Sequence, residues 1–518
     1  MIGADTGNTA DSTPTVDNRC FLGSDRVKRF GTLQHFAQAP TTRLVVLLLL
    51  LTTGAIWEAI HVSAFSSDDL WWHLRTGTWI LQNRAIPRTG LFSQLSTARW
   101  IDFSWLYDAV FGAVYALLGL RAVPLLLMMC KVALAAITFL LAGGRRNFWW
   151  ALALSASAQF VLLYPQPPLI FSLCFFGLTL HWLLESRRRC ELLPLLRLPI
   201  LFWVWANLDA QFVLGLLLLL IFVLAETSEN LLSLSAKSDT RRLSLVHLFA
   251  ITGACFVAVL ITPYSIDLIP AALRSSYSPT LFKNFAGMAA MSFRQPEHFG
   301  LALLLFSACI GLGRQRSRDV FKIALLTLWA ALAFRIQRES WTIILPSIAI
   351  LGDAIGTHSG ESSASESGSA RKLYLKLAAG VAILLTLSFF CLPTNTTLET
   401  RLERILPVKA CNYIQSNHLP APIFNEYGWG GYLMWKLPEY PVSIDERLNL
   451  YGDQSSEAYF EAVMGKRRME TLPGFADEQT ILLPANISMA KALTTIPVLQ
   501  EQFREVYRDD IAIVLVRR

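Results

Sequence analysis

Long runs of apolar residues recur along this chain and are separated by short polar segments. The first covers 44–64, and ten more are expected near 121–142, 148–163, 168–185, 192–207, 211–226, 243–263, 299–313, 320–336, 340–354 and 372–391. About 20 apolar residues suffice for a helix to cross the hydrocarbon core of a bilayer. The first run is too long for the apolar core of a signal peptide and lacks a small-residue cleavage site. The pattern predicts a polytopic α-helical membrane protein with about 11 transmembrane helices.

The pattern changes after residue 392, where charge rises and short strand-like runs alternate with Gly and Pro. The stretch "APIFNEYGWGGYLMWKLPEYPVSIDERLNLYGD" predicts a strand, a glycine turn, a helix and a second strand that ends on charged residues. Two further segments, "QTILLP" and "REVYRDDIAIVLVR", are expected to supply later strands. Residues 393–518 are therefore expected to form a small α/β domain that follows a membrane domain at 43–392.

Basic clusters between the apolar runs orient the chain, because Lys and Arg gather in cytoplasmic loops. The clusters are Arg145 and Arg146, Arg187 to Arg189, Arg241 and Arg242, Arg314 to Arg318, and Arg371 and Lys372. We expect a bacterial inner-membrane protein with a disordered cytoplasmic tail at 1–42, a flexible cytoplasmic linker at 357–370, and an extracytoplasmic C-terminal domain. Two long loops then lie outside, at 65–120 and 264–298.

Residues 103–119, "FSWLYDAVFGAVYALLG", are apolar enough to be taken for one more span. A span at this point would move Arg145 and every later basic cluster to the outside. The segment is also short and carries Asp108, so we expect an amphipathic helix along the outer interface.

Composition agrees with a membrane protein, since 53% of the 518 residues are hydrophobic and only 16% are charged. The net charge of +7 follows from the cytoplasmic clusters, so no nucleic-acid partner is expected. The cysteines show neither CxxC spacing nor a Cys/His cluster, which excludes a zinc site of the usual pattern.

The first outer loop opens with two adjacent carboxylates, Asp68 and Asp69. Either could act as a general base toward an acceptor hydroxyl or help to hold a divalent cation. The alternative is a solvated cap of the following helix, where Asp is favoured. In that helix the tryptophans are expected to form an interfacial belt and His73 to be a surface histidine.

Several arginines are expected on the outer side, although Lys and Arg prefer cytoplasmic loops, so a function is sought for them. They are Arg75, Arg84, Arg88 and Arg99 in the first loop, and Arg335 and Arg338 at the outer end of a span. Guanidinium groups bind phosphate bidentately, so a lipid-linked donor phosphate is one partner. The alternatives for the first-loop arginines are lipid headgroups or ion pairs with Asp102 and Asp108.

Two further groups of residues are candidates for loop and acceptor binding. Glu297 and His298 close the loop 264–298, which is long enough to be a lid; the alternative is contact with the membrane surface. In the C-terminal domain, Glu426, Tyr427 and Trp429 surround a glycine turn, and Asp445 ends a predicted strand. The alternative is a tight turn with buried aromatic residues and a surface ion pair between Asp445 and Arg447.

The motifs "DDLWWHLRTGTWILQNRAIPRTGLFS" and "WIDFSWLYDAVFGAVYALLGLRAVPLLL", in this layout of spans and outer domain, resemble a bacterial subgroup of the GT-C class of polyprenyl-phosphate-dependent glycosyltransferases. The segment "IFNEYGWGGYLMWKLPEYPVSIDERLNLYGD" resembles the end of the same subgroup. More distantly, it is similar to the Trp-Trp-Asp-Tyr-Gly element of oligosaccharyltransferases, with Asn425, Glu426, Tyr427 and Gly428 in corresponding places.

The resemblance implies that Asp69, with Asp68 as its near-equivalent, is the catalytic carboxylate and that Arg335 or Arg338 faces the donor phosphate. Phe424 and Asn425 replace the two tryptophans of the oligosaccharyltransferase element, so recognition of a peptide sequon is not implied. The second acidic pair of the family has no clear counterpart, and Asp209 is the nearest candidate. Metal dependence is therefore open, with Asp68, Asp69 and Asp209 as candidate ligands and a divalent metal as the cofactor to test.

We expect a membrane glycosyltransferase that moves a sugar from a polyprenyl-phosphate-linked donor to a hydroxyl on a glycan, lipid or protein acceptor at the outer face. The rival is a non-catalytic membrane scaffold or glycan-binding protein that retains the same fold. A transporter is disfavoured because the sequence shows no internal repeat and few charges in mid-span.

Overall fold

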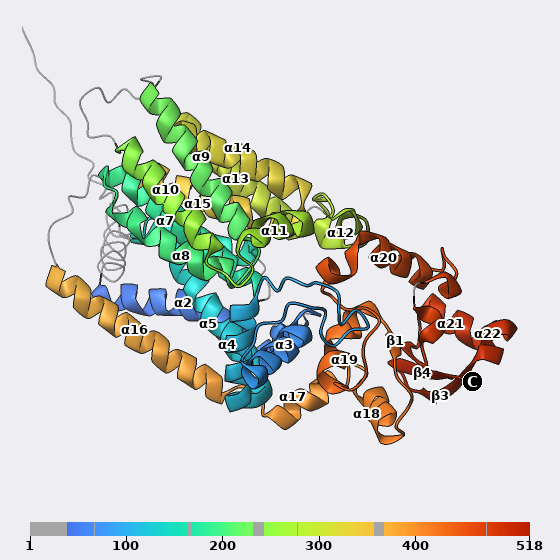
Figure 1. Cartoon of the computed structure of the whole chain (residues 1–518). Coiled ribbons are helices and arrows are strands. Elements are labelled where there is room, and N and C mark those ends of the chain that lie inside the picture. The colour runs from blue at the N-terminus through green and yellow to red at the C-terminus, as the bar shows by residue number, and fades with distance from the viewer. Residues whose placement is uncertain are drawn as a thin grey trace, which may run out of the picture.

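The computed structural model describes residues 39–518 except 67, 145, 163–166, 232–242, 277, 357–366 and 473. Most of the expected tail at 1–42 and of the linker at 357–370 lies outside these residues, as do Arg145 and the basic pair at 241 and 242. The described chain forms a bundle of helices with a smaller domain at one end, which contains a β-sheet (Figure 1).

Every expected apolar run coincides with a helix. These helices are α2 (Pro40–His61), α5 (Ala122–Leu141), α6 (Phe148–Val161), α7 (Leu169–Arg189), α8 (Leu198–Ala206), α9 (Phe212–Leu231), α10 (Leu245–Leu260), α13 (Pro296–Arg314), α14 (Val320–Arg335), α15 (Trp341–Gly356) and α16 (Ser367–Phe390). Within the described residues, five helical segments are long and apolar enough to cross a membrane, or up to seven if each bent pair is one span. The number of about 11 spans stays a prediction.

The expected interfacial segment 103–119 forms α4 (Trp105–Leu118), which passes through one 3₁₀ turn into α5. Together they make a single apolar stretch of 37 residues, Trp105–Leu141. At 1.5 Å per residue this stretch extends about 55 Å, well beyond the hydrocarbon core of about 30 Å. Part of it must therefore stand outside a bilayer, and α4 is the part that packs beside α3 (Leu70–Asn83) of the first loop.

The long loop 264–298 is largely helical. α10 turns by 103° into the helical segment that contains α11 (Leu268–Ser276), which is followed by α12 (Pro279–Asn284). Both helices lie between the bundle and the C-terminal domain (Figure 1). α16 likewise bends by 64° into α17 (Asn395–Leu402) at the start of that domain.

The C-terminal domain is α/β, as predicted. Its sheet has the order β1-β2-β4-β3, with β1 (Ile423–Asn425), β2 (Thr480–Pro484), β3 (Phe503–Arg508) and β4 (Ala512–Arg517). β1 and β2 are parallel, whereas β4 is antiparallel to both of its neighbours. The remaining helices of the domain are α18 (Val408–Ser416), α19 (Gly430–Lys436), α20 (Leu448–Val463), α21 (Ser488–Thr495) and α22 (Pro497–Gln502).

The second predicted strand of this domain, the one ending at Asp445, is not a strand. Val442 makes only single bridges, one to Ser93 of the first loop and one to Ile423 of β1. The backbone N–H of Val442 donates to the carbonyl of Phe92 at 3.2 Å. The segment therefore joins the first loop to β1, a pairing across some 350 residues of chain that local alternation could not reveal.

Buried charges also occur inside the bundle. Nζ of Lys131 on α5 lies 2.8 Å from Oε2 of Glu58 on α2, and both side chains are essentially inaccessible. Each charge compensates the other, since an isolated ion at this depth would be costly.

Candidate functional site

A cavity of about 550 Å³ lies where the bundle, the first loop, the long loop and the C-terminal domain meet. Residues from all four regions line it, although they are spread over more than 350 positions of the sequence. The principal lining residues are Asp69, Trp72, His73, Trp100, Asp209, Gln211, Phe285, Met288, Arg338, Glu339, Tyr427, Glu446 and Arg447. Four predicted site residues therefore share one cavity: Asp69, Asp209, Arg338 and Tyr427.

Asp69 stands at the N-terminus of α3, but its side chain makes no capping hydrogen bond. Its Oδ1 instead accepts a hydrogen bond from the indole Nε1 of Trp72 at 3.3 Å. The cap interpretation thus does not explain the side chain, which is exposed toward the cavity.

Asp68 occupies a different place from Asp69, outside the cavity lining and beside the glycine turn. A Cβ added to Gly428 would lie 3.2 Å from Oδ2 of Asp68 and 3.4 Å from Oε2 of Glu426. Burial, and then the charge of Asp69, raise the pKa of Asp68. Burial also raises the pKa of Glu426, helped by Asp68. The two carboxyl groups therefore lie close together where the first loop meets the C-terminal domain.

Asp209 and Arg338 contribute to the cavity from the bundle. Asp209 follows α8 and accepts a hydrogen bond from Oγ of Ser172 at 2.5 Å, and burial raises its pKa to about 6. Arg338 follows α14, and its side chain is 47% exposed. Its Nε lies 3.4 Å from Oε1 of Glu339, which also accepts from the amide of Gln211 at 2.9 Å. Arg338 is therefore held loosely enough to bind a further anion.

The other predicted phosphate-binding arginines do not line the cavity. Arg75 is stacked on Phe92, 4.6 Å from the ring centroid, and burial lowers its pKa. Arg88 donates to the carbonyl of Pro263 at 3.3 Å, and Arg335 lies over the ring of Phe282. Each of these arginines ties neighbouring segments together.

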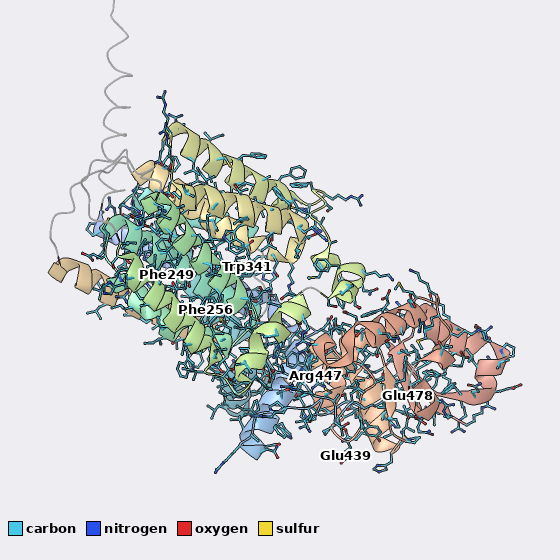
Figure 2. The ribbon with its side chains drawn as sticks, turned by 45° about the horizontal axis from the view of Figure 1, so that its top comes forward. Phe249, Phe256, Trp341, Glu439, Arg447 and Glu478 are labelled. Carbon is cyan, nitrogen blue, oxygen red and sulfur yellow. The ribbon has the colours of Figure 1, made fainter. Side chains whose placement is uncertain are left out.

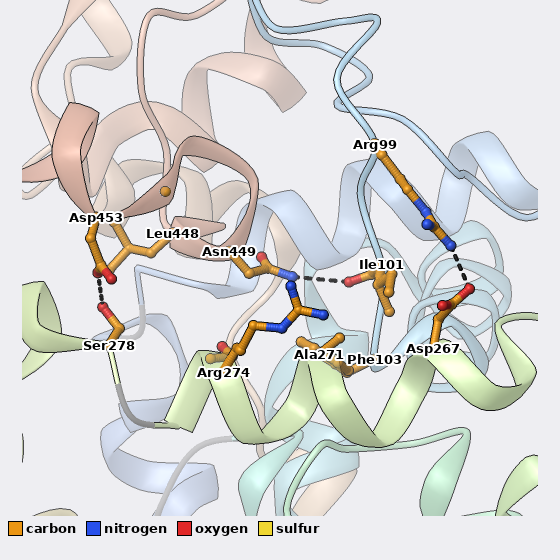
Figure 3. Close-up of a pocket in the computed structure, with 12 residues that line it drawn as sticks. Arg99, Ile101, Phe103, Asp267, Ala271, Arg274, Ser278, Leu448, Asn449 and Asp453 are labelled. Carbon is orange, nitrogen blue, oxygen red and sulfur yellow. Dashed lines mark hydrogen bonds and ion pairs between the residues drawn. The ribbon is translucent and has the colours of Figure 1, made fainter.

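A second pocket, of about 310 Å³, lies beside the cavity, and the two share Ile101, Phe103, Ser275, Leu448 and Asn449 in their walls. Figure 3 shows it between the first loop, α11 and α20. Arg99 pairs there with Asp267 at 2.5 Å, not with Asp102 or Asp108 as one alternative had it.

The glycine-turn region contributes Tyr427 and Glu446 to the cavity. Tyr427 packs against Phe285 of the long loop, with ring centroids 5.5 Å apart. Glu446 accepts the backbone N–H of Gly431 at 3.1 Å, and burial raises its pKa well above the usual range. Trp429 is buried in the core and does not line the cavity.

Asp445 is held in a buried ion pair rather than a surface one. Nη2 of Arg447 lies 2.8 Å from Oδ2 of Asp445, and both side chains are almost inaccessible. The guanidinium also lies 4.7 Å from the ring centroid of Trp100 in the first loop. Figure 2 shows Arg447 at this junction and Glu478 deeper in the domain.

The end of the long loop does not reach the cavity. His298 is buried on α13 beside Phe293, and Glu297 is half-buried in the first turn of that helix. The earlier part of the loop contributes Leu273, Ser275, Ser276, Phe285, Gly287 and Met288 instead.

Two sequence-based interpretations of α3 are wrong. Trp71 is 1% exposed and packs against Tyr432 and Trp435 of α19, so it is a core residue and not part of an interfacial belt. His73 is 2% exposed, so it is not a surface histidine. The first loop is covered by the C-terminal domain, which converts an apparently surface helix into a buried one. The spacing of four residues between Asp69 and His73 was the available signal, because it puts both on one helix face.

The described residues contain no group of three or more His, Cys, Asp or Glu side chains arranged to hold a metal ion. Asp69 and Asp209 line the same cavity, but Asp68 lies outside it.

No protein-family profile matches this sequence, and no curated protein matches it. The crystal structure of the Archaeoglobus fulgidus oligosaccharyltransferase, tethered to an acceptor peptide with an NVT sequon, is similar over 93% of this chain and 75% of its own, with TM-score 0.50 and 11% identity. The crystal structure of ArnT from Cupriavidus metallidurans bound to undecaprenyl phosphate covers 94% of this chain and 98% of its own at 12% identity. Its TM-score of 0.36 is too low to carry an argument.

The likeness to the oligosaccharyltransferase confirms the predicted fold. It covers nearly the whole chain, so it includes both the bundle and the C-terminal domain. This protein therefore shares the fold of that oligosaccharyltransferase, in agreement with the fold that the resemblance to the GT-C class predicted. At 11% identity the likeness concerns fold alone, and the activity must be argued from the cavity.

Proposed function

We propose that this protein is a membrane glycosyltransferase that moves a sugar from a polyprenyl-phosphate-linked donor to a hydroxyl acceptor at the outer face of a bacterial inner membrane. One observation carries the proposal: Asp69, Asp209, Arg338 and Tyr427 line one cavity in a chain with the GT-C fold. Two acidic groups and one loosely held guanidinium at the end of an apolar bundle suit a substrate with a phosphate head and a lipid tail.

Arg338 is assigned to the donor phosphate. It is half exposed in the cavity, and its contact to Glu339 is long. Neighbouring wall residues are apolar, among them Val213, Leu214, Leu332 and Ile336, and would contact the first isoprenoid units. A guanidinium can bind two phosphate oxygens at once, which neutralises charge on the leaving group.

Asp69 is assigned to the acceptor. Within the described residues its carboxylate accepts from the indole of Trp72, and it faces the cavity, so it can accept hydrogen bonds from an incoming substrate. Tyr427 and Trp100 offer aromatic faces in the same wall. Because the lipid phosphate is already a good leaving group, positioning and charge neutralisation supply most of the catalysis.

The test is transfer of radiolabelled sugar from a panel of polyprenyl-phosphate donors, in membranes that contain wild type or a variant. Asp69→Asn should lower transfer by about 10²- to 10⁴-fold, the usual range for a group that activates or orients a nucleophile. Arg338→Gln should lower kcat/KM for the donor by about 10- to 100-fold, since hydrogen bonds to charged groups are worth about 1.5–3 kcal/mol.

Arg335→Gln is the matched control. It removes a guanidinium three residues away that stacks on Phe282 outside the cavity, so transfer should stay near the wild-type level. Equal losses in Arg335→Gln and Arg338→Gln would contradict the phosphate assignment. Absence of transfer by the wild type with every donor would favour the non-catalytic scaffold or glycan-binding alternative.

A further inference from the structure

His73 lies one helical turn beyond Asp69 and belongs to the wall of the same cavity. Its backbone N–H donates to the carbonyl of Asp69 at 3.4 Å, and both residues line the cavity. The imidazole is stacked on the indole of Trp72, with centroids 3.6 Å apart. The same indole donates to the Asp69 carboxylate, so Trp72 holds the histidine and the carboxylate together.

One nitrogen of this ring is bound to a buried carboxyl group. Nδ1 of His73 lies 2.6 Å from Oδ1 of Asp108 on α4, and the two side chains are 3% and 0% exposed. Two glycines allow this contact: a Cβ on Gly77 would lie 1.9 Å from the carbonyl oxygen of Asp108, and one on Gly112 would lie 2.7 Å from the carbonyl carbon of Gly77. No larger residue would let α3 and α4 approach so closely.

A third side chain, Asp102, stands behind Asp108. Its Oδ1 accepts the backbone N–H of Ser104 at 2.9 Å. The second oxygens of Asp102 and Asp108 are buried and receive no N–H or hydroxyl donor within the described residues, and the two carboxyl groups hydrogen-bond each other. Burial, and then the charge of Asp108, raise the pKa of Asp102 well above its usual range. Burial raises the pKa of Asp108 as well, but the hydrogen bond between the two groups lowers the pKa of Asp108 and raises that of Asp102, so Asp102 holds the proton and donates to Asp108.

This arrangement fixes the tautomer of His73. Burial lowers the pKa of His73 to about 4, so the ring is neutral at pH 7 and carries one proton. Asp108 accepts a hydrogen bond from Asp102 and can only accept from His73 as well. The ring proton therefore sits on Nδ1, which donates to Asp108. The lone pair of Nε2 is then the free basic site, and the ring stands at the wall of the cavity.

We propose that His73, oriented by Asp108 and Asp102, accepts the proton of the acceptor hydroxyl during sugar transfer, an inference that rests on the proposed function. The acceptor O–H bond breaks and its proton moves to Nε2. The acceptor oxygen bonds to the anomeric carbon, and the bond from that carbon to the phosphate oxygen breaks with its electron pair. The lipid phosphate leaves, and the imidazolium is stabilised by Asp108. Asp69 keeps the role of orienting the acceptor.

Two isosteric substitutions separate this role from a merely structural one. In Asp108→Asn the neutral amide can no longer stabilise the imidazolium that forms when Nε2 takes the proton, so His73 becomes a much poorer base. Transfer should fall by about 10²- to 10⁴-fold while KM for the donor is unchanged. In Asp102→Asn the amide N–H replaces the carboxyl O–H as the donor to Asp108. The fall in transfer should therefore be at least about tenfold smaller than in Asp108→Asn.

Imidazole rescue supplies the second readout. His73→Ala opens space beside the cavity, so added imidazole should restore part of the transfer. Asp69→Asn leaves His73 in place and should gain nothing from imidazole. Exposed His61, on α2, provides the control substitution His61→Gln, which should transfer normally. Thermal unfolding of each purified variant shows which ones are folded.

The inference is overturned if folded Asp108→Asn keeps wild-type transfer, if Asp102→Asn and Asp108→Asn lose it equally, or if imidazole fails to rescue folded His73→Ala. In each case an active wild type leaves the proposed function standing. A wild type inactive with every donor would overturn both.

Discussion

Substitution of Gly77 by Ala tests the packing on which the cavity depends. The new Cβ would lie 1.9 Å from the carbonyl oxygen of Asp108 and 2.6 Å from its carbonyl carbon, whereas ordinary contacts begin near 3.4 Å. These neighbours are backbone atoms and cannot rotate away, so α3 and α4 must separate by about 1.5 Å. Overpacking of this kind costs typically about 1–3 kcal/mol, occasionally more.

The same separation acts on the site. The 2.6 Å contact between His73 and Asp108 would stretch to about 4 Å if the whole shift were transmitted, which is beyond hydrogen-bonding distance. Gly77→Ala should therefore lower both the unfolding free energy and sugar transfer. The assays are thermal unfolding of the detergent-solubilised protein and the radiolabel transfer reaction.

Gly253→Ala is the matched control for Gly77→Ala. Gly253 lies inside α10, and a Cβ there would meet nothing within 4 Å. Replacing a helical Gly by Ala at such a position should stabilise the protein by about 0.5–1 kcal/mol. The reasoning is refuted if Gly77→Ala unfolds within 0.5 kcal/mol (roughly the effect of a neutral surface change) of wild type and transfers normally.

Three further changes have expected outcomes that thermal unfolding can check. Lys131→Met leaves Glu58 as an uncompensated buried charge and should cost about 3–5 kcal/mol, whereas adding Glu58→Gln should recover most of the loss. Arg447→Lys cannot keep two hydrogen bonds to Asp445, so it should lower the unfolding temperature clearly, and no change would contradict a structural role for the pair. Burial raises the pKa of Glu478 to about 7, so the folded state binds the extra proton. Its contribution to stability is complete below about pH 4.5 and is lost as pH rises to 7, and Glu478→Gln should flatten that part of the pH profile.

The apolar runs predicted the helices because a helix that is buried or in contact with lipid needs about 20 neighbouring apolar residues, and such a run can be recognised in the sequence. Even the short runs, such as 192–207, contain a helix, here α8 preceded by a 3₁₀ turn. The strands β2 and β4 were likewise readable as short apolar runs that contain β-branched residues. The segment around Val442 was misassigned because its hydrogen-bonding partners include Phe92 of the first loop, which is remote in sequence.

The candidate residues were chosen singly, for being charged or aromatic where composition did not require it. That criterion found Asp69, Asp209, Arg338 and Tyr427, which line the cavity, together with Arg75, Arg88 and Arg335, which do not. The neighbouring residues in the sequence do not distinguish the two sets. Whether an arginine stacks on a phenylalanine or faces the cavity depends on residues that are distant in sequence.

By itself, the sequence determined that this chain forms an apolar helical bundle followed by an α/β domain, since hydrophobic period and length act over neighbouring residues. Only the tertiary structure decided which polar groups share a site. Gly77 and Gly112 bring two helix backbones into contact, and the C-terminal domain covers α3, so His73 becomes a buried partner of Asp108. Burial and the contact with Asp108 determine which nitrogen of His73 carries the proton, and both exist only in the folded chain.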